Sequence, residues 1–375
     1  MNKPLYREIY ESILNKINEG EWKYGDKIPS EKELADQFNV SRITSKKALD
    51  LLSQEKRIKR IQGKGSFVTK GAASNSSVTL EANSQLRKDI FTVGLIISDF
   101  SESFGVTLVK QIEKEITKLG GLLYLKLSLE NVVEEEKAIE ELLDIGVDGL
   151  IILPVHGEHY NMKILELVLR KFPLVLIDRY LRGIQASAVL TDNIRASTVA
   201  TNYLFSLGHR EVAYITPPDD GTTVLADRLT GYQQAFHQQQ YPYNPEIILT
   251  SSVTDYLVFK EQGAAFEEEL KKIQQFLLEN PTITGFVSCR YSLAIVLQHV
   301  IHTIGKEVPK DYSVVCFDSP KMNIGPFPFT HILQDEVGIA KKTVLLLHEK
   351  MKGKNHTEKE LVQFELIEGL STREV

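Results

Sequence analysis

The chain has 375 residues, is 42% apolar and 25% charged, and carries a formal net charge of −6 at pH 7. The length exceeds one ordinary core, so we expect two or three domains, and the composition is that of a soluble globular protein. No apolar run reaches the roughly 18 residues of a membrane span, the first residues lack a signal-peptide core, and Cys289 and Cys316 are too few for a disulfide framework. These features exclude a membrane protein and a disulfide-rich secreted protein, and they favour the cytoplasm.

Charge is distributed unevenly along the chain. Residues 1–70 carry fifteen Lys or Arg side chains and ten Asp or Glu side chains, so the remaining residues carry a net charge of −11. Residues 40–70 contain nine Lys or Arg side chains, and their only acidic side chains are Asp50 and Glu55. This asymmetry predicts that the amino-terminal segment alone approaches a polyanion, and a merely solvated basic surface is the alternative.

The first 54 residues predict three helices. Apolar residues recur every four positions from Leu5 to Ile17, which gives the first helix one buried stripe. Ser30 and Glu33 have the spacing of a capping box at the start of the second helix, and a third helix is expected to begin at Ser41.

The third predicted helix has a core face and an outward face. The positions expected to face the core are Ser45, Ala48, Leu49 and Leu52. Ile43, Lys46 and Lys47 point outward, and Arg42 lies in the first turn. Two short helices joined by a tight turn, with cations exposed on the second, predict a helix-turn-helix that enters the major groove of DNA.

Residues 58–68 predict a small β-hairpin. IKRI at 58–61 and SFV at 66–68 flank the glycine turn QGKG at 62–65, so the segment is typical of the wing of a winged helix. The GKGS sequence is not a nucleotide-binding loop, because that motif needs a glycine where Ile58 stands.

Residues 4–69, with PLY, GDKIPSEKELADQF, VSR and QGKGSFV, resemble the GntR-type winged-helix DNA-binding domain over its whole length. The resemblance implies DNA contacts from Lys32, Ser41, Arg42, Ile43, Thr44 and Lys46, and from Gln62, Gly63 and Lys64 at the wing tip. Ile43 replaces a common hydroxyl residue, which suggests contact with a thymine methyl group. Lys46 replaces a frequent arginine and lacks its bidentate geometry toward guanine.

Residues 71–89 are rich in Ser, Asn and Ala and predict a flexible linker between the 1–70 head and a 90–375 body. Apolar strands then alternate with amphipathic helices, which predicts parallel sheets with helices on both faces. Polar residues follow the strands at Ser98-Asp99, Asp178-Arg179, Asp192-Asn193, Arg290-Tyr291 and Asp318, where open parallel sheets bind ligands.

No GxGxxG, GxSxG or HExxH motif occurs, so we expect neither an enzyme nor a bound cofactor. His156 and His159, like His299 and His302, have a spacing that metals use, but neither pair has a nearby third ligand in the sequence. We therefore expect no metal site.

The order LIDR, VLTDN, LGHREVAYI, DRLTGY and VVCFDS resembles the effector-binding domain of LacI/GalR-type regulators over roughly residues 91–370. The resemblance implies a two-lobed, periplasmic-binding-protein-like α/β fold, a carbohydrate effector between the lobes and a homodimer. We expect lobe 1 at about 90–191 and 319–333, and lobe 2 at about 192–318 and 334–375. The joined head and body resemble bacterial arabinose-repressor proteins.

The resemblance implies that Asp178 and Arg228 hydrogen-bond the effector. The full predicted effector set is Ser98, Phe104, Asp178, Arg228, Arg290, Tyr291 and Asp318. Arg290-Tyr291 stand where many relatives have Asn-Asp, so Tyr291 could stack on a sugar face and Arg290 could pair with an acidic effector. A simple structural ion pair is the alternative for Arg290.

We therefore expect a repressor that binds a pseudo-palindromic operator as a dimer and is released by a sugar or sugar-derived effector such as arabinose. The alternative within gene regulation is activation or corepression by an anionic effector, such as a sugar phosphate or uronate. An enzyme is the rival from another class, but the sequence lacks the GxGxxG, GxSxG and HExxH motifs. A sugar transport receptor is opposed by the missing signal peptide and by the winged helix.

Overall fold

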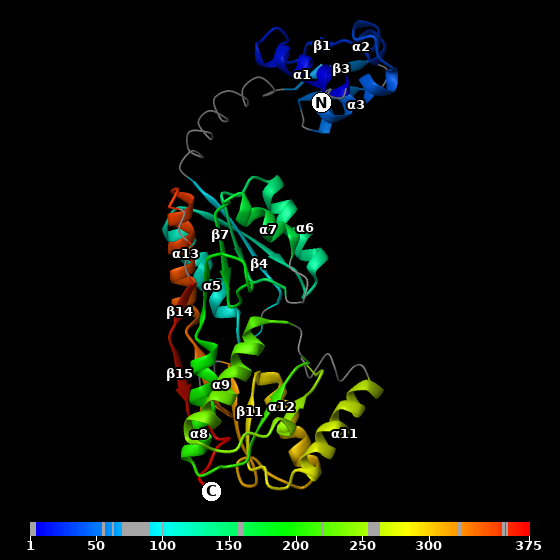
Figure 1. Cartoon of the computed structure of the whole chain (residues 1–375). Coiled ribbons are helices and arrows are strands. Elements are labelled where there is room, and N and C mark those ends of the chain that lie inside the picture. The colour runs from blue at the N-terminus through cyan, green and yellow to red at the C-terminus, as the bar shows by residue number, and fades with distance from the viewer. Residues whose placement is uncertain are drawn as a thin grey trace. The chain divides into compact units, whose positions relative to one another are not determined.

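The computed structural model describes residues 5–54, 57–61, 64–69, 90–99, 101, 103–155, 161–218, 221–253, 263–320, 325–354, 357 and 359–375. The chain divides into two compact units, Met1–Ile90 and Phe91–Val375 (Figure 1). The predicted linker at 71–89 lies outside the described residues. Within the described ranges, no helix combines the length and the apolar character needed to cross a membrane.

The amino-terminal unit is a winged helix-turn-helix. Its elements are α1 (Leu5–Asn18), β1 (Lys27–Ile28), α2 (Glu31–Gln37), α3 (Arg42–Gln54), β2 (Ile58–Ile61) and β3 (Gly65–Val68). Strand β3 pairs antiparallel with both β1 and β2, which confirms the predicted wing hairpin. The predicted core face of the third helix is also confirmed, because Ser45, Ala48, Leu49 and Leu52 are all buried.

The second unit begins with a lobe built on a six-stranded parallel sheet. The strands, in spatial order, are β14 (Lys359–Val362), β8 (Ala188–Thr191), β7 (Leu174–Ile177), β6 (Gly149–Ile152), β4 (Thr92–Ile97) and β5 (Leu122–Leu127). Helices α5 (Val106–Lys118) and α13 (Glu336–Met351) cover one face, and α6 (Val132–Asp144) and α7 (Met162–Leu169) cover the other (Figure 1). Alternate residues of one strand serve both layers, since Leu95 packs with α5 and Ile96 packs with α6.

The second lobe is a similar sheet with one antiparallel edge. Its strands, in spatial order, are β10 (Ile248–Thr250), β9 (Val212–Thr216), β11 (Gly285–Ser288), β12 (Ser313–Phe317), β13 (Thr330–Gln334) and the antiparallel β15 (Phe364–Ile367). Its helices are α8 (Asn193–Ser206), α9 (Thr223–Gln239), α11 (Ala264–Glu279) and α12 (Tyr291–Thr303), with the short 3-10 helix η1 (Pro245–Ile247) before β10. The fold prediction is confirmed: two α/β lobes follow a winged helix-turn-helix.

The expected assignment of the carboxyl-terminal segments to the lobes is wrong. Strand β13 belongs to lobe 2, because it pairs with β12, and not to a first lobe that includes 319–333. Helix α13 and strand β14 belong to lobe 1, whereas the expectation from the sequence places 334–375 in lobe 2. The reason is packing: Ile339 and Leu347 of α13 share a core with Val93 and Val175 of the lobe 1 sheet.

The described part of the chain therefore passes between the lobes three times. The first crossover joins β8 to α8 at 191–193, the second joins β13 to α13 at 334–336, and the third joins β14 to β15 at 362–364. The lobes also touch directly, since Tyr180 donates its amide hydrogen to Thr223 Oγ1 at 3.2 Å and its hydroxyl hydrogen to Asp227 Oδ1 at 3.2 Å. The three crossover segments together form the hinge between the two lobes.

Candidate functional site

Two hydroxyl groups fix the helix-turn-helix. Ser30 Oγ accepts the amide hydrogen of Glu33 at 3.3 Å, and the Ser30 amide donates to Glu33 Oε2 at 2.7 Å, so the predicted capping box is present. These bonds hold the pKa of Glu33 below its ordinary value. Ser45 is fully buried and donates from Oγ to the carbonyl of Glu31 at 2.7 Å, which ties α3 to the first turn of α2.

The head exposes cations that have no ionic partner in the described part of the chain. Lys32 on α2 and Arg42 and Lys46 on α3 are exposed, and their side chains make no hydrogen bond or ion pair with a described residue. Lys64 is exposed where the turn enters β3, and its amide donates to the carbonyl of Ile61 at 3.0 Å. Unpaired cations of this kind are available to phosphates and base edges.

The structure describes some of the remaining residues predicted to contact DNA. Ser41 precedes α3 and Thr44 lies in its first turn, with their hydroxyl oxygens 2.9 Å apart. Ser41 Oγ also accepts the amide hydrogen of Thr44 at 3.2 Å, so these hydroxyls order the helix start. Ile43 belongs to α3, but its side chain lies outside the described atoms, as do Gln62 and Gly63 altogether.

Two other cations of the head have structural partners. Arg60 on β2 pairs with both Asp50 on α3 and Glu31 on α2, and it thereby joins the wing to both helices. Lys47, predicted to point outward, is exposed, and its Nζ lies 4.2 Å from the centroid of the Tyr6 ring. The pairing of Arg60 needed the tertiary structure, because its partners are distant in sequence.

All seven predicted effector residues line one cavity between the lobes, with a volume of about 760 Å³. Lobe 1 contributes Ser98, Phe104 and Asp178, and lobe 2 contributes Arg228, Arg290, Tyr291 and Asp318. The strand ends of both sheets therefore face a shared space, as open parallel sheets require of a ligand site.

Each lobe presents one aspartate from a left-handed backbone position at the end of a strand. Asp178 follows β7 with φ of 62°, and Asp318 follows β12 with φ of 66°. Such conformations are costly for a residue other than glycine and cluster at functional sites. Asp178 is 7% exposed, its side chain accepts no hydrogen bond from any described residue, and its nearest cation is Arg179, with Nε 3.9 Å from Oδ2.

Arg228 is held rigidly and keeps one nitrogen for the cavity. Its Nε donates to Asn193 Oδ1 at 2.8 Å, its Nη1 donates to the carbonyl of Cys289 at 2.6 Å, and its guanidinium carbon lies 3.8 Å from the centroid of the Phe317 ring. Within the described ranges, no protein group accepts a hydrogen bond from Nη2. The residue lines the cavity while only 4% exposed, so its donor direction is fixed before a ligand arrives.

Among the carboxyl groups of the described residues, that of Asp318 has the most strongly raised pKa. Burial raises the pKa of its carboxyl from 3.8 to about 7, against the opposing effect of the Arg228 guanidinium and of a hydrogen bond from Gln334. Strongly perturbed acids that line a cavity are candidates for ligand contact. The Asp318 carboxyl therefore offers a ligand either an acceptor or a donor near neutral pH.

Arg290 and Tyr291 begin α12 on the lobe 2 side of the cavity. Arg290 occupies the N-cap position, and its side chain has no hydrogen bond or ion pair with any residue that the structure describes. This excludes an ion pair with a described residue as the role of Arg290 in the present conformation. Tyr291 packs edge-on against Phe329 at 5.8 Å between ring centroids, so part of its ring serves the lobe 2 core.

Several residues of this cavity are not among the predicted site residues. Gln334, at the end of β13, and Leu129 and Glu130, in the loop after β5, line it as well. Leu129 and Glu130 have φ of 50° and 56°, and no sequence signal marks this pair as left-handed. Gln334 is the last residue of β13, and the rule that polar residues at strand ends line a ligand site would have found it if this strand had been predicted.

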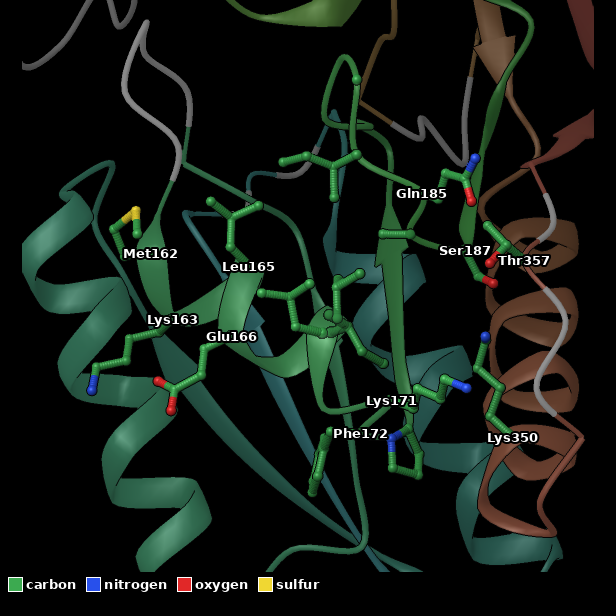
Figure 2. Close-up of a pocket in the computed structure, with 17 residues that line it drawn as sticks. Met162, Lys163, Leu165, Glu166, Lys171, Phe172, Gln185, Ser187, Lys350 and Thr357 are labelled. Carbon is green, nitrogen blue, oxygen red and sulfur yellow. The ribbon is translucent and has the colours of Figure 1, made fainter.

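A second hollow of about 950 Å³ lies on the outside of lobe 1 (Figure 2). Figure 2 shows Met162, Leu165 and Phe172 on its α7 side and Lys350 opposite. It contains none of the predicted site residues and draws on lobe 1 alone, so the cleft between the lobes is the better effector site.

The described residues contain no group of three or more His, Cys, Asp and Glu side chains that is arranged to hold a metal. His156 and His159 lie outside the described residues. Cys289 and Cys316 are both buried and unbridged.

Comparison with known proteins supports this architecture. Residues 5–68 match the model of the gntR family of bacterial regulatory proteins, and residues 201–372 match the periplasmic binding protein-like domain. The arabinose metabolism transcriptional repressor of Geobacillus stearothermophilus is 30% identical over 84% of this chain and 82% of its own length.

Two solved structures share the fold. The transcription regulator CcpA of Lactococcus lactis has a TM-score of 0.64 at 22% identity, over 76% of this chain and all of that one. A LacI family transcriptional regulator from Enterococcus faecium with bound ribose has a TM-score of 0.60 at 24% identity, over 76% of this chain and 99% of that one. The chain belongs to the family of bacterial transcriptional repressors that includes the Geobacillus stearothermophilus protein, and it joins a gntR-type DNA-binding head to a periplasmic-binding-protein-like body.

Proposed function

We propose that this protein is a cytoplasmic repressor of sugar-utilisation genes that leaves its operator when a sugar or sugar-derived effector, such as arabinose, occupies the cavity between the lobes. The supporting observation is that seven residues chosen from the sequence converge from both lobes on one cavity. The relative from Geobacillus stearothermophilus is a repressor of arabinose metabolism, which supports a sugar as the regulatory signal.

The cavity chemistry suits a polyhydroxylated ligand. Asp178 offers carboxylate acceptors, and Arg228 offers the fixed donor Nη2. Adjacent sugar hydroxyls both donate and accept, so they satisfy such a pair together. A ligand bound by both groups bridges the two lobes and favours the conformation in which they close around it.

The DNA partner follows from the head. Arg42 and Lys46 on α3, with Lys32 on α2, leave unpaired cations on a helix-turn-helix. A helix of this type reads the major groove, and the wing contributes Lys64. We propose that two heads of a dimer bind the two half-sites of a pseudo-palindromic operator.

The edge strand β5 supports the proposed dimer. Its exposed apolar residues are Leu122, Tyr124, Leu125 and Leu127, which are 40–53% exposed. An exposed apolar sheet edge is a ready site of self-association. Sedimentation equilibrium of the full chain tests this, and a protein that stays monomeric at micromolar concentration would contradict it.

The direct test begins with DNA. The full-length protein is incubated with fragmented genomic DNA from its own source, retained fragments are sequenced, and the selected site is then titrated with candidate sugars in a gel shift. We expect one site class with two-fold symmetry, and release of that site by one sugar class. Retention of no fragment in dilute buffer would overturn the proposal.

A second candidate differs in the direction of the response. A corepressor would strengthen operator binding, and the unpaired Arg290 in the cavity favours an anionic compound in that role. The same titration separates the two, because a corepressor moves the shifted band toward lower protein concentration and an inducer moves it toward higher protein concentration.

A further inference from the structure

We infer that the effector carries an anionic group, a carboxylate or a phosphate, which binds between the Arg290 guanidinium and the amino end of α12. This inference rests on the proposed function, because it concerns the ligand of the same cavity. It assigns the effector to a chemical class, the acidic monosaccharides.

Arg290 lines a ligand cavity and has no ion-pair partner among the described residues. Its side chain lines the space between the lobes, is partly buried, and makes no hydrogen bond or ion pair with the residues described. An arginine cannot deprotonate to escape this position. Its backbone is fixed, since Ser288 Oγ donates to the Arg290 carbonyl at 2.8 Å, so the guanidinium extends from a well-defined point.

The amino end of α12 adds donors at the same place. The first amides of a helix have no intrahelical partner, and the N-cap side chain of Arg290 supplies no capping bond. Tyr291, Ser292 and Ile295 of this helix line the cavity, so its first turn faces the ligand space. The helix has 13 residues, and its dipole places partial positive charge at that end. A guanidinium and unsatisfied amides that face one cavity are the donor set that carboxylates and phosphates prefer.

Other residues of the cavity are suited to the hydroxyl groups of a sugar. Asp178 and Asp318 offer oxygens to hydroxyl groups, and Arg228 Nη2 offers a single fixed donor. A ligand that fits both sets therefore combines hydroxyl groups with one acidic substituent. A neutral sugar satisfies the aspartates but gives Arg290 no partner, and enclosing an unpaired charge when the lobes close is costly.

Glu130 and Asp99 are competing counter-charges. Both line the same cavity from lobe 1, so closure on a neutral sugar would be eased if Arg290 paired with one of them, such as Glu130, across the cleft. In that case Arg290 would hold the lobes together for every ligand, and removing its charge would weaken neutral and acidic ligands equally. The two roles therefore predict different results for the same variant.

Calorimetry of the full-length protein with matched ligand pairs tests the inference. The pairs are arabinose with arabinose 5-phosphate, and galactose with galacturonate, each titrated into the wild type, Arg290→Gln and Arg290→Lys. Arg170→Gln is the matched control, since this exposed arginine on lobe 1 does not line the cavity. The melting temperature without ligand reports whether each variant is folded.

We expect an acidic member of one pair to bind at least about tenfold more tightly than its neutral partner. Arg290→Gln should lower the affinity for the acidic ligand by about 10- to 100-fold and change the affinity for its neutral partner by no more than about twofold. Arg290→Lys should lower the affinity for the acidic ligand less than Arg290→Gln does. Arg170→Gln should change neither the affinity for the acidic ligand nor that for its neutral partner. Preference for phosphate over carboxylate, or the reverse, identifies the acidic group.

Tighter binding of a neutral sugar, unchanged by Arg290→Gln, would overturn the inference and leave the proposed function intact. An equal loss for neutral and acidic ligands would also overturn it, in favour of the ion pair with Glu130. If no sugar of either kind binds or shifts operator affinity, the inference and the proposed function fail together.

Discussion

The side-chain amide of Gln334 donates from Nε2 to both carboxyl oxygens of Asp318, at 2.9 Å to Oδ1 and 3.2 Å to Oδ2. Gln334 Oε1 accepts in turn from Thr191 Oγ1 at 2.7 Å. Thr191 ends β8 at the first crossover and Gln334 ends β13 at the second, so one side chain links both crossovers to a cavity residue. Asn193 makes a parallel link, since it accepts from Arg228. The groups proposed to bind the effector are therefore attached to the hinge.

Thr191→Val tests this link with almost no change in volume. The variant leaves the buried Oε1 of Gln334 without its donor, so we expect the free energy of unfolding to fall by about 1–3 kcal/mol and effector affinity to fall severalfold. Urea unfolding and calorimetry measure the two effects. Thr117→Val on α5 is the control, because its exposed hydroxyl serves only Glu113, and both quantities should stay unchanged. Equal behaviour of the two variants would contradict the hinge role.

The pKa of Asp318 predicts a specific pH dependence. Burial raises it from 3.8 to about 7, so between these values the folded chain holds a proton that the unfolded chain releases. The stability associated with this group is fully present below pH 4 and is lost as the pH rises through 7, by at most about 1.4 kcal/mol per pH unit. Asp318→Asn should flatten this part of the stability curve relative to the wild type. Parallel curves for the two proteins between pH 4 and 7 would contradict the prediction.

The exposed cations of the head should dominate the salt dependence of DNA binding. If two heads neutralise about eight phosphates, the logarithm of the association constant should fall with the logarithm of salt concentration at a slope of about −7. Lys46→Ala should make that slope less steep by about 2 in a dimer if Lys46 contacts phosphate. Lys16→Ala on α1, whose ammonium pairs with Glu21 at 3.1 Å, should leave it unchanged. A slope near zero for the wild type would refute groove binding by the head.

Arg60 should stabilise the head through its two carboxylate partners. We expect Arg60→Met to cost about 1 kcal/mol and to speed amide hydrogen exchange in α2 and α3, because Glu31 and Asp50 lose their shared cation. Lys59→Met is the matched control, since Lys59 is an exposed cation on the same strand. Identical exchange rates in the two variants would show that the ion pairs contribute nothing.

The sequence predicted the head well because its signals are local. The capping box of Ser30 and Glu33 and the buried face of Ser45, Ala48, Leu49 and Leu52 depend on spacing within single helices. The double ion pair of Arg60 escaped prediction, since it joins residues from three separate elements.

In the body, parallel strands and their polar ends could be predicted. Four of the five predicted strand ends line one cavity, whereas Asp192 and Asn193 do not line it. The error concerned the crossings between the lobes, because a strand such as β13 has the same apolar pattern in either sheet. Only its pairing with β12 shows that β13 belongs to the sheet of lobe 2. Gln334 was missed for the same reason, since its importance comes from its position at a crossover.

One titration tests the central claim that cavity occupancy controls the head. Labelled operator DNA bound to the full-length protein is titrated with the effector while fluorescence anisotropy reports release, and calorimetry gives the effector affinity of the DNA-free protein under the same conditions. We predict release at concentrations set by that affinity, and a shift to much higher concentrations in Arg228→Gln. If the cavity saturates by calorimetry while the operator stays bound with unchanged affinity, the two units are not coupled and the account is contradicted.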